Sequence, residues 1–287
     1  MMAQQYLMDI VKISEKRLRE AKLYFGHGTD NAWDEAAYLA LFALGLAPDT
    51  PLESIHLLTP KQVEAILQWI EERIRTGKPA PYLTHEAWFC GLKFYVNEHV
   101  MIPRSPIGEL IMKGFSPWLM ASPKNILDLC TGSGAIAIAC AKAFPKAAVD
   151  AIDISGDALS VARKNAVIHQ VEDQVNLIQS NLLEKIENKK YDLIISNPPY
   201  VSFEEMQTLP REYAFEPSIA FAGGGKDGLE IVDRILAQAK NHLTPEGLLI
   251  VEVGNGQQAL IKRYPKIPFT WLMFEYGGQG VFLLSSY

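Results

Sequence analysis

The chain of 287 residues is poor in the residues that build metal centres and disulfide frameworks. Its three cysteines, Cys90, Cys130 and Cys140, form no C-x-x-C pair, and an odd, sparse set does not suit a disulfide framework. The six histidines show no H-x-x-x-H pairing, and no Cys/His cluster has zinc spacing. We therefore expect no bound metal, and we expect reduced thiols in a cytoplasmic protein.

Long apolar segments and an excess of positive charge are also missing. No apolar run reaches the roughly 18 residues that suggest a membrane span, so no membrane association is expected. The net charge is -6 and no Lys/Arg cluster stands out, whereas proteins that bind bare nucleic acid usually carry a basic patch. Direct DNA binding is therefore not expected. An acidic surface suits a basic protein partner, although charge alone is explained as well by solubility.

Residues 1–80 are predicted to form a helical domain without a chemical motif of its own. Apolar residues at helical spacing predict a first helix over residues 7–21 and a second from about residue 30 to residue 45. A third helix begins at Thr59 and Pro60, which suit the N-cap and the first helical position, and it ends at Gly77.

Residues 81–104 are predicted to form a linker with a β-hairpin. The aromatic and β-branched segment 88–96 predicts one strand, and residues 97–98 predict a turn before the apolar segment 100–102. A helix is then expected over residues 107–119.

Residues 105–287 alternate short apolar strands with amphipathic helices. This alternation predicts an α/β domain with a mainly parallel, doubly wound sheet of seven strands. The last two strands lie close together in the sequence and suggest an antiparallel hairpin at the sheet edge. The predicted strands cover residues 125–129, 148–152, 175–179, 192–196, 248–253, 269–274 and 280–284, and predicted helices include 135–143, 157–169 and 228–242.

The segment from Cys130 to Gly134 follows the predicted strand that holds Asp128, and a helix of small residues comes next. Its glycines let the backbone turn sharply and approach a ligand, and ligands of such sheets bind outside the carboxyl ends of the strands. Asp153 ends the next strand, where a carboxylate can accept hydrogen bonds from two ribose hydroxyls.

Three interpretations of this loop remain open. Gly132, Gly134 and Ala137 satisfy the dinucleotide fingerprint G-x-G-x-x-G/A, so a nicotinamide enzyme is one of them. A tight strand-to-helix turn without a ligand is the second. S-adenosylmethionine is the third, and Asp128 favours it. An acid just before the loop can accept from the amino group of an amino-acid moiety, which S-adenosylmethionine has and NAD lacks.

Asn197-Pro198-Pro199-Tyr200 directly follows another apolar strand. An amide nitrogen is hard to methylate because its lone pair is delocalised, so a site must hold the NH₂ group and aim that lone pair. Asn197 supplies an acceptor oxygen, the prolines stiffen the turn and lack N–H groups, and Tyr200 offers a flat face. The turn therefore indicates methylation of a planar amide or base. A proline turn that merely caps the strand is the alternative, and the nearby cofactor loop disfavours it.

These motifs, behind a helical N-terminal domain, resemble the bacterial protein-glutamine methyltransferases over nearly the whole chain. That family methylates the Gly-Gly-Gln glutamine of peptide release factors or, in a sister branch, a glutamine of large-subunit ribosomal protein L-three. Segments 24–36, 87–91 and 268–271 resemble the ribosomal-protein branch. Residues 103–110 stand where the release-factor branch usually has Pro-Arg-x-Asp-Thr-Glu, and Cys130 replaces the first glycine common in that branch.

The resemblance implies a Rossmann-like class I S-adenosylmethionine-dependent methyltransferase domain over residues 105–287 and glutamine N-methyltransferase activity. It also implies that residues 1–80 recognise the protein substrate, a basic ribosomal protein L-three. The family often has Asp where Asn181 stands. Asn181 keeps one acceptor oxygen for the adenine amino group but loses the charge. The implied catalytic residues are Asn197, Pro198, Pro199 and Tyr200. The implied cofactor-binding residues are Asp128, Cys130, Thr131, Gly132, Ser133, Gly134, Asp153, Asn181, Leu182 and Asn197.

Other functions remain as alternatives. An adenine-amine methyltransferase of DNA or RNA needs the same turn, because an adenine amino group is also a conjugated NH₂, but the acidic charge disfavours it. A release-factor methyltransferase differs only in its partner. A non-catalytic module for ribosome assembly is disfavoured because both halves of the active site look intact. The chain has no G-x-S-x-G nucleophile elbow and no Walker loop, and Cys130 is interpreted as a turn residue rather than a nucleophile.

Overall fold

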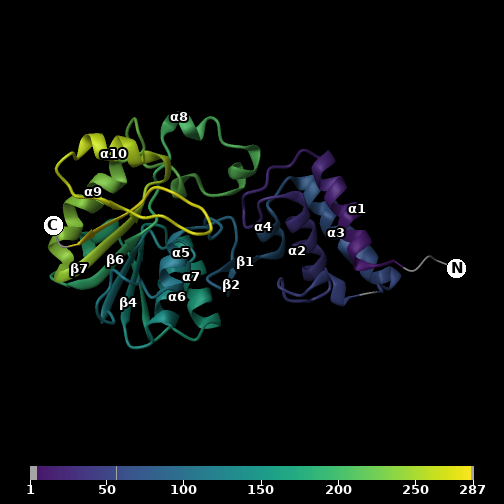
Figure 1. Cartoon of the computed structure of the whole chain (residues 1–287), viewed down its shortest axis with the longest axis horizontal. Helices are drawn as coiled ribbons and strands as arrows, with labels where there is room; N and C mark the ends of the chain where they lie inside the picture. The colour runs from purple at the N-terminus through teal and green to yellow at the C-terminus, as the bar shows by residue number, and fades with distance from the viewer. Residues whose placement is uncertain (1–4, 56, 286–287) are drawn as a thin grey trace. The chain divides into compact units, whose positions relative to one another are not determined.

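The computed structural model describes residues 5–55 and 57–285 (Figure 1). Backbone contacts divide the chain into two compact units. The helical unit comprises the chain up to Glu86 together with Pro210–Phe215, and the sheet unit comprises Ala87–Leu209 and the chain from Glu216 onward. A short segment from the second half of the sequence is therefore part of the helical unit, which the sequence did not predict.

The helical unit contains the three predicted helices, α1 (Leu7–Glu20), α2 (Ala32–Ala43) and α3 (Pro60–Thr76). The predicted start and end of α3 are confirmed. Thr59 and Gln62 form a capping box at its start, and Gly77 ends it in the left-handed conformation at φ 69°. A further short helix, α4 (Ala80–Thr84), lies where a linker was expected, because Pro81 is tolerated in the first helical turn.

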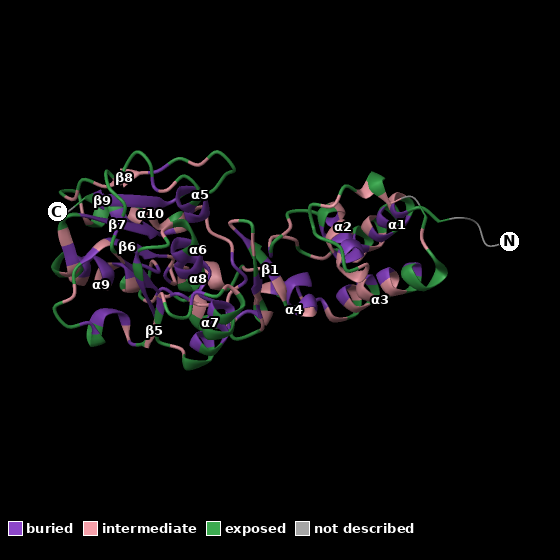
Figure 2. Cartoon of the chain, turned by 90° about the horizontal axis from the view of Figure 1, so that it is seen from below, coloured by how far each residue is buried: buried purple, intermediate pink, exposed green. Residues whose placement is uncertain are grey.

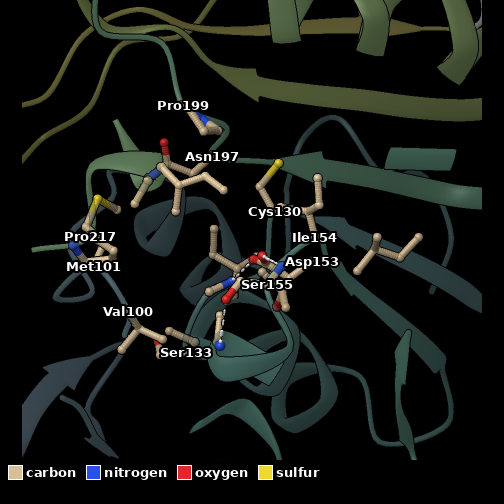
Figure 3. A pocket seen from close by; sticks show the side chains of 18 of the residues that line it. Val100, Met101, Cys130, Ser133, Asp153, Ile154, Ser155, Asn197, Pro199 and Pro217 are labelled. Atoms are coloured by element: carbon tan, nitrogen blue, oxygen red, sulfur yellow. Dashed lines mark hydrogen bonds between the residues drawn. The ribbon is translucent and has the colours of Figure 1, made fainter. Parts of the chain in front are cut away.

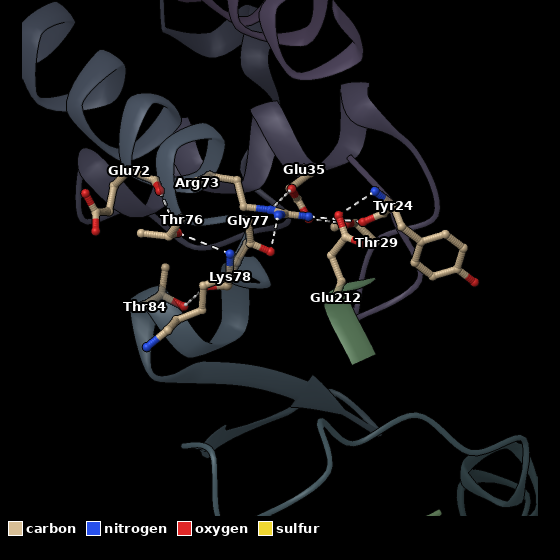
Figure 4. A network of polar contacts seen from close by, with 11 residues as sticks. Tyr24, Thr29, Glu35, Glu72, Arg73, Thr76, Gly77, Lys78, Thr84 and Glu212 are labelled. Carbon is tan, nitrogen blue, oxygen red and sulfur yellow. Dashed lines mark hydrogen bonds and ion pairs between the residues drawn. The ribbon is translucent and has the colours of Figure 1, made fainter. Parts of the chain in front are cut away.

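The mostly apolar core of the helical unit contains a buried ion pair, Arg73 with Glu35 (Figure 4). Arg73 Nε donates to Glu35 Oε1 at 2.7 Å, and both side chains are 1% exposed. The guanidinium also donates to the backbone carbonyls of Gly77 and Tyr24, at 2.8 and 3.0 Å. The amide of Tyr24 in turn donates to Glu212 at 2.8 Å. This network fastens the segment Pro210–Phe215 to the helices of the same unit.

The predicted β-hairpin is present, but its turn lies elsewhere. Strands β1 (Glu86–Phe89) and β2 (Leu92–Tyr95) are joined at Cys90 and Gly91, with φ of 51° and 71°. A turn does lie at the predicted residues 97–98, since Val100 N donates to Asn97 O at 3.1 Å, but it does not join the hairpin strands, and residues 100–102 form no strand. A tight hairpin turn needs positive φ at both central positions, which Cys90 and Gly91 supply. The helix predicted over residues 107–119 is also shorter, since α5 (Ile107–Met112) stops before left-handed Gly114.

Within residues 87–285, a mostly parallel seven-stranded sheet forms the centre of the sheet unit. Its order is β5-β4-β3-β6-β7-β9-β8. The late strand β9 pairs antiparallel with both β7 and β8, so the predicted late hairpin is confirmed. The strands are β3 (Asn125–Leu129), β4 (Ala148–Asp153), β5 (Val175–Gln179), β6 (Tyr191–Ser196), β7 (Leu243–Glu252), β8 (Thr270–Trp271) and β9 (Val281–Ser285).

Helices cover both faces of this sheet, and alternate residues of β3 face the two layers. Ile126 packs with α5, α6 (Ala135–Ala143) and α7 (Gly156–Ile168). Leu127 packs with α9 (Glu230–Ala239) and α10 (Gln257–Arg263). The central strands β3, β6 and β7 are largely buried, as the purple ribbon of Figure 2 shows. A sheet covered on both faces exposes ligand-binding groups only at its edges and strand ends.

The direction of the connections reverses between β3 and β6, which are paired neighbours. Leu129 at the end of β3 lies opposite Ser196 at the end of β6. The residues that follow, Cys130 and Asn197, therefore begin two loops at the same sheet edge. Such a reversal is where ligands bind in open α/β sheets, because the diverging loops leave a crevice.

The buried ion pair of the helical unit gives a stability prediction. Arg73→Ala should lower the local free energy of unfolding by about 3–5 kcal/mol, because it leaves the Glu35 carboxylate buried without its cation. Arg75→Ala, which removes a solvent-screened pair with Glu72 on the same helix, should leave it nearly unchanged. Hydrogen exchange of the α2 and α3 amides measures both. Equal effects of the two substitutions would contradict the prediction.

Candidate active site

A cavity of about 400 Å³ lies at the carboxyl ends of β3, β4 and β6, within the sheet unit (Figure 3). Asn197 and Pro199 lie toward one end of it in this view, Asp153 and Ser155 lie farther along, and Cys130 lies between. The predicted residues that line it are Cys130, Thr131, Gly132, Ser133, Asp153, Asn181, Leu182, Asn197 and Pro199. The predicted residues that do not line it are Asp128, Gly134, Pro198 and Tyr200.

The loop after β3 reaches the cavity through left-handed backbone. Cys130, Gly132 and Gly134 have φ of 60°, 54° and 80°. A Cβ on Gly134 would lie 3.1 Å from the Cβ of Ala162, so glycine allows α6 and α7 to pack closely. Cys130 accepts a left-handed conformation that glycine adopts more easily. The thiol is poorly reactive because burial raises its pKa.

Asp153 fixes this loop to the end of β4. Its Oδ2 accepts from the amide of Gly132 and its Oδ1 accepts from the amide of Ser155, both at 2.9 Å. Burial raises the pKa of the carboxyl group, and the backbone hydrogen bonds oppose that shift. Each carboxylate oxygen has a second lone pair, so the side chain can accept further hydrogen bonds from a ligand.

Asp128 lies directly behind the lining and is 1% exposed. Its Oδ2 accepts from the hydroxyl of Thr131 at 2.5 Å and from the amide of Ala137 at 3.1 Å. Its Oδ1 is buried without a hydrogen-bond partner. Burial raises the pKa of this carboxyl group to about 7, because nothing in contact supplies a compensating positive charge. A cationic donor at Oδ1 would satisfy this oxygen and restore the ionised form.

Asn181 and Leu182 follow β5 and line the cavity. The amide nitrogen of Asn181 donates to Glu184 Oε1 at 2.7 Å, and Arg234 donates to the same oxygen at 3.3 Å. The side-chain nitrogen of Asn181 therefore already donates to Glu184, and the side-chain oxygen of Asn181 can act as a hydrogen-bond acceptor. Leu182 is left-handed at φ 53°, a second strained position at the lining.

Asn197 presents the second orphan oxygen of the site. Its Oδ1 is buried without a hydrogen-bond partner. The preceding Ser196 donates from its hydroxyl to the carbonyl of Leu129 at 2.9 Å and so ties the ends of β6 and β3 together. The oxygen of Asn197 is thus held beside the loop of Cys130, in a position to accept from an N–H group of a ligand.

Four further polar residues at this end were not predicted as site residues by the sequence analysis: Arg104, Ser105, Glu216 and Glu252. Tyr200 donates from its hydroxyl to Glu252 Oε1 at 2.7 Å, and Ser105 donates to Oε2 of the same carboxylate at 2.6 Å. Arg104 holds Glu216 through two hydrogen bonds of 2.6 Å. The position of Glu252 at a strand end, like that of Asp153, was the available signal.

Residues 5–55 and 57–285 contain neither a candidate metal site nor a helix that could span a membrane. No group of three or more His, Cys, Asp or Glu side chains there could hold a metal ion. In the same residues, every helix is too short or too polar to cross a bilayer.

Comparisons with known proteins agree with this geometry. The family model of the methyltransferase small domain matches residues 110–212. A solved methyltransferase from Pyrococcus furiosus superposes with a TM-score of 0.51 at 19% identity, over 68% of this chain and 89% of that one. The sheet unit therefore has the class I methyltransferase fold, with the all-α part and the hairpin before it.

Sequence relatives are similar over nearly the whole chain. The ribosomal protein uL3 glutamine methyltransferase of Francisella tularensis is 44% identical, over 97% of this chain and 90% of that protein. The protein of the same name from Bordetella pertussis is 42% identical, over 98% of this chain and 95% of that protein. The chain belongs to the family of ribosomal protein uL3 glutamine methyltransferases.

Proposed function

We propose that the chain transfers a methyl group from S-adenosylmethionine to the side-chain amide nitrogen of a glutamine in ribosomal protein uL3. The observation that carries the proposal is the orphan Oδ1 of Asn197 beside the loop of Cys130, because it is an acceptor for the N–H of an amide. The two relatives named for this reaction support it. Since uL3 is a ribosomal protein, we expect the enzyme to act in the cytoplasm.

The lining suits S-adenosylmethionine at three points. Asp153 lies at a strand end, where its carboxylate can accept from two ribose hydroxyls. Oδ1 of Asp128, buried behind the lining without a hydrogen-bond partner, can accept from the α-ammonium group. Asn181 directs its oxygen away from Glu184, and this oxygen can accept from the adenine amino group. We therefore infer that the replacement of aspartate by Asn181 preserves the adenine contact without the charge.

When bound, this cofactor supplies an electrophilic methyl group on a sulfonium sulfur. Asn197 accepts one N–H of the glutamine amide and fixes the orientation of the nitrogen. The carbonyls of Pro198 and Pro199 have no competing N–H of their own and can accept the other N–H. Drawing both N–H groups toward acceptors turns the nitrogen lone pair toward the methyl group. The acceleration then comes from positioning and preorganised dipoles, with little need for a strong base.

Recognition of the protein substrate is proposed for the helical unit, with its predicted extent of residues 1–80, followed by the linker 81–104 and the catalytic domain 105–287. The net charge of -6 suits a basic ribosomal protein and disfavours DNA. A release factor as substrate would use the same chemistry at Asn197, so the partner must be tested directly.

The test is methyl transfer from labelled S-adenosylmethionine to purified uL3, a release factor and DNA, offered side by side. Mass spectrometry then locates the modified residue. We expect label on one glutamine of uL3 alone. Label on the release factor would retain the chemistry and replace the substrate, whereas label on DNA would show that the proline turn holds a base.

The raised pKa of Asp128 predicts a pH-dependent affinity for the cofactor product S-adenosylhomocysteine. Below pH 7 the carboxyl group takes up a proton and loses the charge that attracts the ammonium group. The affinity should therefore fall with decreasing pH below 7, by up to about tenfold per pH unit. Calorimetric titration measures this. Asp128→Asn should bind weakly and without this pH dependence, and a wild-type affinity that is equal at pH 6 and pH 8 would refute the assignment.

Asn197→Ala separates substrate positioning from cofactor binding. It should lower kcat about a hundredfold, or on the order of 3 kcal/mol, because it removes one preorganised contact to the reacting group. Affinity for S-adenosylhomocysteine should stay largely intact, whereas Asp153→Ala should weaken it. Asn176→Ala, in β5 and outside the cavity lining, is the matched control. Near-normal turnover of Asn197→Ala would show that its role is misassigned.

A further inference from the structure

The hydroxyl of Tyr200 is bound to a buried carboxylate that the mechanism above does not use. Tyr200 donates to Glu252 Oε1 at 2.7 Å, and Ser105 donates to Glu252 Oε2 at 2.6 Å. Glu252 is 5% exposed and ends β7, the strand next to β6. An ionised carboxylate only accepts hydrogen bonds, so both hydroxyl groups must point toward it. One buried side chain therefore orients two hydroxyl groups from distant parts of the sequence.

The ring of Tyr200 is confined as well as its hydroxyl. A Cβ on Gly254 would lie 2.7 Å from Cε2 of the ring, and Gly254 is left-handed at φ 47°. A Cβ on Gly228 would lie 2.4 Å from the carbonyl oxygen of Tyr200. A side chain at either glycine would collide with Tyr200, and the hydrogen bond to Glu252 anchors the hydroxyl end of the tyrosine side chain.

The second partner of Glu252 is itself held in place. Ser105 lines the cavity, as does the preceding residue Arg104. Arg104 forms two 2.6 Å hydrogen bonds to Glu216, whose side chain is 0% exposed. The amide of Ile102 also donates to Glu216, at 3.3 Å. Two adjacent residues of one segment are therefore anchored on two buried glutamates, and Glu252 connects this rigid segment to Tyr200.

We propose that Glu252 is a positioning residue that anchors the hydroxyl end of Tyr200 and so fixes the turn 197–200, whose Asn197 and Pro199 line the cavity, for binding of the glutamine amide. This inference rests on the proposed function. Glu252 acts through Tyr200 and Ser105 and needs no contact with the substrate. Its removal should lower kcat with little effect on cofactor affinity, because Asp128 and Asp153 hold the cofactor at other strand ends.

The sheet unit contains a matched pair of the same chemistry outside the cavity lining. Tyr191 donates from its hydroxyl to Asp150 Oδ2 at 2.6 Å, and Asp150 is 3% exposed. Tyr191 begins β6, whereas Asn197 follows its last residue, so this pair lies toward the opposite end of the strand from the cavity. Loss of this carboxylate removes a buried tyrosine–carboxylate bond without touching the site, so it reports what a purely structural bond contributes.

The experiment is a double-mutant cycle on kcat with Glu252→Ala and Tyr200→Phe. Each single variant should lower kcat by about tenfold or more, and the double variant should be no slower than the slower single variant, because both remove one contact. Glu252→Gln, which keeps one acceptor and can donate to the other hydroxyl oxygen, should recover most of kcat. Asp150→Ala should lower the midpoint of thermal unfolding yet keep kcat per folded molecule.

Three results would overturn the inference. They are unchanged kcat in Glu252→Ala, additive losses in the double variant, or a loss of kcat in Asp150→Ala as large as in Glu252→Ala. If Glu252→Ala does not fold, Ser105→Ala replaces it in the cycle, since it removes the other anchor of the same carboxylate. A parallel loss of affinity for S-adenosylhomocysteine would also contradict a role confined to Tyr200.

A measurement without methyl acceptor separates this inference from the proposed function. The ring signal of Tyr200, assigned in ¹³C-tyrosine-labelled protein by its loss in Tyr200→Phe, should shift and average in Glu252→Ala. An unchanged signal would overturn the positioning role. Wild-type protein that methylates no glutamine would instead overturn the proposed function and leave the ring signal as the test of Glu252.

Discussion

Two buried oxygens without hydrogen-bond donors determine what the site can bind. Asp128 lies near the end of β3, and Asn197 directly follows the neighbouring strand β6. The Oδ1 atoms of both side chains lack a hydrogen-bond partner. A buried acceptor without a donor lowers the stability of the fold by about 1–3 kcal/mol, and a ligand that donates to it removes this penalty. One oxygen belongs to an acid that burial keeps near its titration point, and the other to a neutral amide. A cationic ammonium and an amide N–H are their natural partners.

The rest of the sheet unit holds these two oxygen atoms in place but donates no hydrogen bond to them. Parallel pairing of β3 with β6 brings both oxygen atoms to one edge of the sheet, and the loop after β3 begins with the left-handed residue Cys130. Thr131 occupies only one oxygen of Asp128. Beyond Asn197, the buried carboxylate of Glu252 restrains Tyr200 from the neighbouring strand. Positioning by rigid strands is what a reaction that lacks a strong base requires.

Site residues could be predicted from the sequence where a local sequence pattern marks them. The glycines of the loop after β3, the acid that ends β4 and the proline turn after β6 could be recognised because each follows an apolar strand directly. The capping signals at Thr59 and Gly77 were read correctly for the same local reason. The hairpin turn at Cys90 was missed because a cysteine in left-handed backbone leaves no sequence signal. Long-range partners, such as Glu252 for Tyr200 or Glu212 for Tyr24, depend on the folded topology and could not be predicted.

The most direct measurement of this account is a crystal structure with S-adenosylhomocysteine and a glutamine-containing peptide of uL3. The account predicts a donor within about 3.2 Å of each orphan oxygen, the cofactor ammonium at Oδ1 of Asp128 and the glutamine N–H at Oδ1 of Asn197. It would be contradicted by a glutamine amide bound elsewhere in the cavity, with the oxygen of Asn197 still lacking a donor.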